Sequence, residues 1–304
     1  MRRWLRGLAA AVIAAQAALM PAAGAAQAQR AEAPTAEARP ALWRLADQDT
    51  TIYLFGTMHA LPRGVEWGTA RVALALAEAD ELVLEVADTS DSSAMAEAMR
   101  SAARGEAVPP IVERVPAERR QDLLDAIAAS GLPVQAFDAM KSWTAGLLLA
   151  LVTMQRIGIQ GSSGVEEQLK RGWRDQGREV TGLETAAQQL GFFDELSEES
   201  QRLFLLSALE PEAELRRQFE AMLRAWTAGD TDAIARSFNE DISTTPEMRE
   251  VLLTRRNARW AEWLDQRMDR PGTVFVAVGA GHLAGEGSVQ DMLARRGLRA
   301  ERVQ

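Results

Sequence analysis

The sequence has no cysteine and only two histidines in 304 residues. Without cysteine there can be no disulfide bond, thiolate nucleophile, cysteine-ligated zinc or iron–sulfur cluster. A lipid-anchored export signal is excluded as well, because it needs a cysteine at its cleavage point. Any chemistry that requires an imidazole must use His59, His282 or both.

Basic residues are also in short supply, with 34 Lys and Arg against 43 Asp and Glu and a net charge of −9. An acidic protein is a poor partner for the phosphate backbone of nucleic acids or for anionic lipid. No hydrophobic stretch is both long enough and free enough of charge to span a bilayer. We therefore expect a globular protein that binds no nucleic acid and has no transmembrane anchor in its mature chain.

The N-terminus has the pattern of a cleaved export signal. Residues 1–6 are basic, residues 7–20 are apolar, and Ala26-Gln27-Ala28 fits a cleavage site with small residues. The apolar stretch is shorter than the roughly 20 residues of a membrane span. Cleavage would remove three arginines and no acids, so the net charge of −9 becomes −12. We expect a signal peptide at residues 1–28 and a periplasmic or secreted protein.

The mature chain is predicted to have a short disordered linker, residues 29–40, followed by a single domain at residues 41–304. The linker is rich in Ala, Pro and Glu and shows no periodicity. β-rich runs predict strands at 41–45, 50–55, 81–86, 133–137, 178–183, 273–278 and 298–303. Helical patterns lie between them at 68–79, 142–157, 165–176 and 288–296, and residues 185–269 are almost wholly helical with breaks near Gly191, Pro211, Gly229 and Pro246. This alternation favours a layered α/β fold with a long helical insertion packed on the sheet.

Both histidines follow an apolar strand in the same local pattern. Gly56 precedes His59 by three residues, and Gly279 precedes His282 by three. A glycine at this point lets the chain leave the strand in a conformation that a β-branched residue would resist. Residues just past the carboxyl ends of strands are where α/β sheets gather ligands. The shared pattern indicates that the two imidazoles lie at one edge of the sheet.

Acidic residues end other predicted strands and fit the same site. Glu85, Asp138 and Glu184 each close a short β-rich run. Two neutral imidazoles with one or two carboxylates would make a divalent-metal site that keeps positions open for water. Such an ion lowers the pKa of bound water, and a spare carboxylate would serve as general base.

Each of these residues also has a structural interpretation. A histidine at a strand end is commonly held by hydrogen bonds alone, and Glu184 has the position of an acid at a helix N-terminus. Glu85 favours function because an acid in an apolar strand is costly to bury unpaired. Asp138 is expected to be structural. Trp226, Trp260 and Trp263 follow helical spacing and are expected in the core.

Other catalytic motifs are missing from the sequence. It has no His-Glu-x-x-His helix and no Gly-x-Ser-x-Gly nucleophile elbow. Residues 279–284 match the dinucleotide pattern G-x-G-x-x-A, but they lie too near the C-terminus for the strands that such a site needs.

An ordered set of short motifs resembles the TraB/GumN family, the bacterial branch of the Tiki-like superfamily of metalloprotease-like proteins. The motifs are GTMH at 56–59, LP at 61–62, LVLE at 82–85, KSW at 141–143, GVE at 164–166, GLET at 182–185, QL at 189–190, RN at 256–257, VGAGHL at 278–283 and GEG at 285–287. The resemblance covers residues 41–303, which is nearly the whole mature chain. One departure is Glu166, where the family more often has Asp.

The resemblance implies a site as well as a fold. The family's paired motifs map onto His59 and His282, its strand-end glutamate onto Glu85, its later acid onto Glu184 and its arginine onto Arg256. The implied fold is a mixed sheet flanked by helices, like that of the erythromycin esterase and ChaN haem-binding proteins. Tiki members are described as peptidases that use manganese or cobalt, and zinc is a further possibility.

We therefore expect a metal-dependent hydrolase that acts on peptides or proteins. His59, Glu85 and His282 would hold the ion, Glu184 would be a further ligand or the general base, and Arg256 would stabilise an oxyanion. The alternative is a non-catalytic envelope protein in which the same rim binds haem, a metal ion or a glycan fragment, linked to polysaccharide export.

Overall fold

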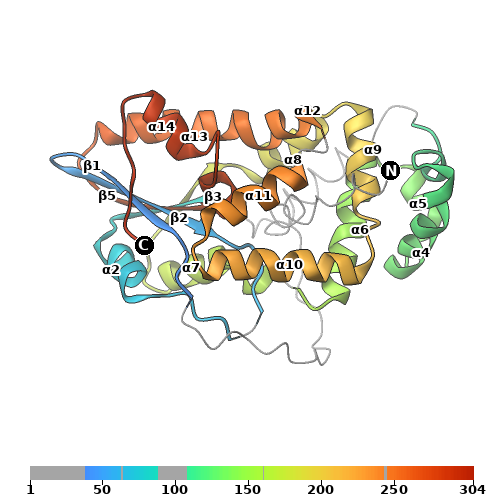
Figure 1. Ribbon diagram of the computed structural model, residues 1–304, viewed down its shortest axis with the longest axis horizontal. Helices are drawn as coiled ribbons and strands as arrows, with labels where there is room; N and C mark the ends of the chain where they lie inside the picture. Colours follow the sequence, from blue (N-terminus) through green and yellow to red (C-terminus); the bar gives the residue numbers. More distant parts are fainter. Residues whose placement is uncertain (1–37, 63, 88–107, 160, 243–244) are drawn as a thin grey trace.

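The computed structural model describes residues 38–62, 64–87, 108–159, 161–242 and 245–304. At its centre is a six-stranded sheet with the strand order β4-β3-β5-β2-β1-β6 (Figure 1). The strands are β1 (Leu42–Ala46), β2 (Thr50–Thr57), β3 (Glu81–Val86), β4 (Val180–Glu184), β5 (Gly272–Gly279) and β6 (Glu301–Arg302). Strands β2, β5, β3 and β4 are parallel, and β1 and β6 pair antiparallel at one side. The expected α/β fold with a mixed sheet flanked by helices is confirmed.

Helices cover the sheet and extend well beyond it. They are α2 (Ala70–Glu78), α4 (Arg120–Ser130), α5 (Val134–Asp138), α6 (Ser142–Arg156), α7 (Val165–Arg174), α8 (Ala186–Asp194), α9 (Glu198–Ser207), α10 (Glu212–Thr227), α11 (Thr231–Ile242), α12 (Pro246–Arg249), α13 (Arg255–Met268) and α14 (Val289–Arg295). A π-helical turn, η5 (Glu250–Thr254), joins α12 to α13, and a 3₁₀ turn, η6 (Ala280–Leu283), follows β5. The expected helical stretch between β4 and β5 is therefore present as α8 to α13. Among the described helices, none combines the length and apolar character that a bilayer crossing requires.

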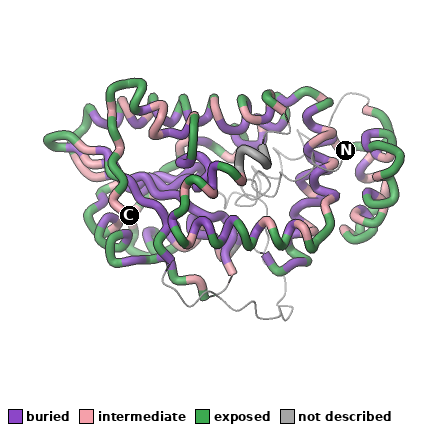
Figure 2. Tube along the Cα trace, in the orientation of Figure 1, coloured by how far each residue is buried: buried purple, intermediate pink, exposed green. Residues whose placement is uncertain are grey.

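The central strands β2, β3 and β5 are largely apolar on both faces because helices bury both (Figures 1 and 2). Alternate residues of one strand point to opposite sides. In β5, Val274 and Val276 pack with Trp260 and Leu264 of α13, whereas Phe275 packs with residues of α2, α6 and α10 in the larger core. Trp226 and Trp260 are buried in these two cores, as the helical spacing predicts, and Trp263 packs at the edge of the smaller one.

Four local predictions are wrong. Residues 134–138 form helix α5 rather than a strand, because Val134 and Phe137, three residues apart, lie on one face of a helix and pack against the larger core; Pro133 stays extended as the N-cap, with ψ 152°. Gly191 lies inside α8 without breaking it. The final strand shrinks to β6. Residues 38–40 of the expected linker are packed: Ala38 is buried and bonds the backbone of Glu66. The rest of that linker and the export signal lie outside the described residues.

Candidate functional site

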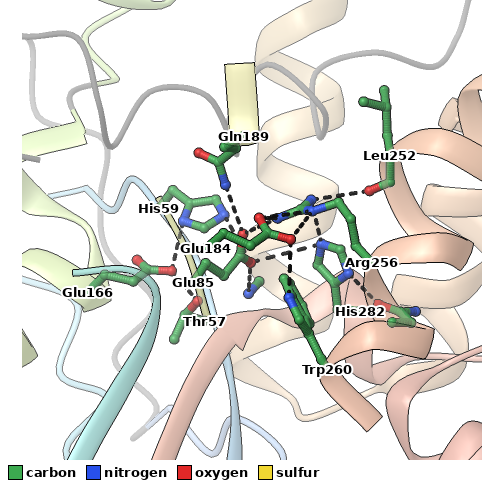
Figure 3. Close-up of polar contacts among 12 residues, drawn as sticks. Thr57, His59, Glu85, Glu166, Glu184, Gln189, Leu252, Arg256, Trp260 and His282 are labelled. Carbon is green, nitrogen blue, oxygen red and sulfur yellow. Dashed lines mark hydrogen bonds and ion pairs between the residues drawn. The ribbon is translucent and has the colours of Figure 1, made fainter. Parts of the chain in front are cut away.

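The carboxyl ends of the four parallel strands meet at one edge of the sheet. In the register, Thr57 at the end of β2 lies opposite Gly279 at the end of β5, and Val86 of β3 lies opposite Glu184 of β4. The pairing of the strands therefore brings together residues that are far apart along the chain. Figure 3 shows the resulting cluster of His59, Glu85, Glu184, Arg256 and His282, and all five are buried.

The glycines of the two histidine motifs are needed for space rather than for an unusual backbone conformation. Neither Gly56 nor Gly279 has a positive φ, so the expected conformational reason is wrong. A Cβ on Gly56 would lie 3.2 Å from the Cα of Ala280 in the other motif. A Cβ on Gly279 would lie 3.1 Å from both Glu85 Oε1 and His59 Nε2. The two motifs pack against each other, and Gly279 leaves a gap among the site residues.

Glu85 is at the centre of the cluster. Its Oε1 accepts a hydrogen bond of 2.7 Å from the backbone N–H of Gly279. The same oxygen is 4.0 Å from His59 Nε2 and 3.9 Å from His282 Nε2. Its Oε2 accepts from Arg256 Nη2 at 2.8 Å and from Gln189 Nε2 at 3.2 Å. One carboxylate thus links both histidines to the arginine.

Each histidine has a side-chain oxygen within 2.7 Å of Nδ1: an ion-pair contact at His59 and a hydrogen bond at His282. His59 Nδ1 is 2.7 Å from Glu166 Oε1, which also accepts from the hydroxyl of Thr57. His282 Nδ1 is 2.6 Å from Asn257 Oδ1. The Asn257 amide is oriented by its own donation to the carbonyl of Gly287, so its oxygen faces His282 and must accept. This places the proton of His282 on Nδ1 and leaves the lone pair of Nε2 directed into the site.

Arg256, from the first turn of α13, has an acceptor for every N–H. Its Nε and Nη2 form a forked pair with Glu184, at 2.9 and 2.8 Å, and Nη2 also donates to Glu85. Its Nη1 donates to the carbonyl of Leu252 at 3.1 Å and lies 3.2 Å from His282 Nε2. Leu252 belongs to the π-helical turn η5, an irregularity that often marks functional positions. The arginine is therefore rigidly held.

The protein shifts the pKa values of the two histidines in opposite directions. Burial by itself lowers the pKa of His59, but the carboxylates of Glu166 and Glu85 outweigh burial and raise it to about 9. Burial and the positive charge of Arg256 lower the pKa of His282 to about 3. His59 is thus protonated at neutral pH in the metal-free protein, and His282 is neutral.

The pKa values of Glu85 and Glu184 are also shifted in opposite directions. Burial raises the pKa of Glu85, but Arg256 and the two histidines outweigh burial and lower it to about 2. Burial keeps the pKa of Glu184 above its ordinary value despite the neighbouring guanidinium.

The structure brings together every site residue that the sequence singled out except Asp138. That side chain caps a distant turn, where its Oδ1 accepts from the backbone of Ile111, in line with the expected structural role. Further side chains touch the site without a predicted role, among them Glu166 beside His59. Trp260 donates its indole N–H to Glu184 at 3.1 Å and its ring lies against His282; Asn257 and Gln189 contact His282 and Glu85. Trp260 could have been predicted, because it follows Arg256 by four residues and so lies on the same face of helix α13.

Gly164 is predicted to be essential for the position of His59. A Cβ at Gly164 would lie 2.1 Å from the carbonyl oxygen of His59, and the adjacent Val165 N–H bonds the carbonyl of Met58. Gly164→Ala must therefore displace the backbone that carries His59, and we expect a loss of about 1–3 kcal/mol in unfolding free energy. Urea denaturation measures it.

Gly172, in the same helix α7, provides the matched control. A Cβ there meets nothing within 4 Å. Gly172→Ala should therefore stabilise the protein by about 0.5–1 kcal/mol through helix propensity. If Gly164→Ala behaved like Gly172→Ala, the close approach would have no energetic consequence.

Comparisons with known proteins give the family and little more. The model of the TraB/PrgY/gumN family matches residues 41–302. YbaP of Escherichia coli strain K12, described as an uncharacterized protein, is 27% identical over 247 residues, which cover 79% of this chain and 87% of YbaP. YbaP of Shigella flexneri gives the same values. No solved structure matches the chain, so the expected likeness to erythromycin esterase and ChaN stays a prediction.

Proposed function

The chain belongs to the TraB/PrgY/gumN family, and we propose that it is a metal-dependent hydrolase exported to the periplasm, with peptides or proteins as substrates. His59, Glu85 and His282 would hold a divalent ion, with manganese or cobalt preferred by resemblance and zinc a further candidate. One observation carries the proposal: each imidazole has a side-chain oxygen within 2.7 Å of Nδ1, and the two Nε2 atoms lie 4.0 and 3.9 Å from the same oxygen of Glu85. Metal-binding histidines in proteins have this arrangement.

The chemistry of the donor set fits a divalent cation. Two imidazole nitrogens and a carboxylate are a common ligand set for catalytic zinc and related ions. The missing Cβ of Gly279 leaves space between Glu85 and His59. Within the cluster, the three acidic side chains of Glu85, Glu166 and Glu184 outnumber the two basic groups, the guanidinium of Arg256 and the imidazole of His59, so the balance favours a cation.

When bound, such an ion would act as a Lewis acid and lower the pKa of a water molecule that it binds. The residues of the chain divide the remaining tasks. Glu166 and Asn257 orient the two imidazoles. Glu184 would be a further ligand or the general base, and its oxygens also hold Arg256 by accepting from the guanidinium and from the indole of Trp260. Arg256 is the residue placed to stabilise a developing oxyanion.

Metal content tests the proposal directly. After dialysis against manganese, cobalt or zinc, the wild-type protein should retain about one equivalent, and the His59→Ala, His282→Ala double variant should retain none. Peptide hydrolysis should disappear in the same variant. Full activity in the double variant would end the proposal. A metal-free wild type that gives a Soret band with haem would favour the binding-protein alternative.

Gly279→Ala is a steric version of the same test that keeps every ligand. The backbone at Gly279, with φ −51° and ψ 134°, accepts alanine without strain. The new methyl group would lie 3.1 Å from Glu85 Oε1 and His59 Nε2. We expect a folded protein whose metal affinity falls by about tenfold or more, comparable to the loss of an orienting partner. Isothermal titration calorimetry measures it, and an unchanged affinity would place the ion elsewhere.

A further inference from the structure

We propose that the guanidinium of Arg256 competes with the metal ion for Nε2 of His282. The hydrogen bond between Arg256 and His282 must break before a divalent cation can bind. The inference rests on the proposed metal site and goes beyond it by assigning Arg256 control over metal affinity. It is carried by the 3.2 Å contact between Arg256 Nη1 and His282 Nε2 and by the fixed tautomer of His282.

A neutral imidazole offers one lone pair. Asn257 accepts the proton at Nδ1 of His282, and the Asn257 amide cannot turn without losing its bond to Gly287. The lone pair is therefore on Nε2, which faces Arg256 Nη1. A hydrogen bond from Nη1 and a coordinate bond to a metal need the same electrons in the same direction. The two states exclude each other.

The spacing of the ligands agrees with a site held open. In the described part of the chain, no group of three histidine or acidic side chains is close enough together to hold an ion as it stands. His59 and His282 lie 4.0 and 3.9 Å from Glu85 Oε1, whereas ligands of a tetrahedral ion with bonds near 2.1 Å are roughly 3.4 Å apart. A closure of about half an ångström is needed, and Arg256 opposes it because its bonds to Glu85 Oε2 and His282 Nε2 fix these two side chains at the wider spacing.

The exchange would also free a donor for catalysis. Arg256 keeps its forked pair with Glu184 and its bond to Glu85 when His282 shifts away from Nη1. The released N–H is the one donor of the guanidinium not committed to a carboxylate or to the Leu252 carbonyl. Metal loading and the ability of Arg256 to bind a substrate oxyanion are therefore coupled.

The test compares metal affinity with and without the guanidinium. Arg256→Gln alone would leave Glu85 and Glu184 buried without their cation, so the variant of choice is Arg256→Gln with Glu184→Gln, which removes one charge of each sign. Arg255→Gln, an exposed neighbour paired with Glu195 at 3.1 Å, is the matched control. Binding of Co²⁺ is measured by calorimetry and by the visible absorption of the ion.

We expect the double variant to bind Co²⁺ about tenfold more tightly than wild type, because a hydrogen bond to a charged group no longer has to be broken. Arg255→Gln should bind like wild type. Equal affinity in the double variant and wild type, or weaker binding in the variant, would overturn the inference and leave the metal site intact. No binding in any of these proteins would overturn the metal site, and the inference with it.

A second measurement does not depend on the variant folding. With ¹⁵N-labelled histidine, the protein gives signals from only two imidazoles. In metal-free wild type, His282 should show a protonated Nδ1 and an Nε2 shifted by a strong hydrogen bond, and Zn²⁺ should replace that shift by one typical of coordination. An Nε2 of His282 with the shift of a free lone pair before zinc is added would contradict the competition.

Discussion

Arg256→Ala is expected to lower the free energy of unfolding by about 3–5 kcal/mol, because it leaves two buried carboxylates without their cation. Glu85 and Glu184 are 3% and 7% exposed, and Arg256 is the arginine buried with both of them. Their mutual repulsion adds to the cost of burial. Urea denaturation at pH 7 measures the difference.

The deficit should depend on pH in a defined direction. Without the guanidinium, burial raises the pKa of both carboxyls, so the folded state binds more protons than the unfolded state. The variant should therefore recover stability relative to wild type as the pH falls toward about 4, the ordinary pKa of glutamate. Arg255→Ala is the control: its ion pair with Glu195 is about half exposed, and its loss should change stability by at most about 1 kcal/mol at either pH. A constant deficit across this range would show that lost packing, not lost charge, is responsible.

The two histidines should give the metal-free protein a stability maximum near pH 6.5. For His59 the folded pKa is about 9, above the unfolded value of 6.5. Its contribution is complete below pH 6.5 and is lost as the pH rises to 9, which amounts to about 3 kcal/mol. For His282 the folded pKa is about 3, so the contribution is complete above pH 6.5 and declines as the pH falls.

Single variants separate the alkaline and the acidic side of this dependence of stability on pH. A chelator keeps the protein free of metal during the measurement. His59→Gln should flatten the loss between pH 6.5 and 9. His282→Gln should flatten the loss between pH 6.5 and 4.5, a range above the titration of Glu85, whose pKa falls from its ordinary 4.5 to about 2 in the folded state. Thermal or urea unfolding at several pH values measures both. If His59→Gln left the alkaline side unchanged, the pairing of His59 with Glu166 would not be a stabilising ion pair.

The ends of the parallel strands and the site residues that follow them could be predicted because they depend on short patterns of neighbouring residues. An apolar strand followed by Gly-x-x-His occurs twice, and parallel strands present their carboxyl ends at one edge. His59, Glu85, Glu184 and His282 are thus placed by short-range pattern plus one general rule of sheets. The sequence does not predict helix α5 because its three apolar residues, Val134, Ala136 and Phe137, fit both period 2 and period 3.6 in a segment of five residues.

The sequence by itself determined the four parallel strands, the scarcity of imidazole and the shared spacing of both histidine motifs, since these are properties of composition and of neighbouring residues. Only the tertiary structure decided how Arg256 is used. It lies 171 residues from Glu85 and 72 from Glu184, yet its guanidinium contacts both and also His282. That arrangement depends on the packing of α13 against the sheet and on the turn η5 that begins it, and such contacts between distant segments leave no periodic trace in the chain.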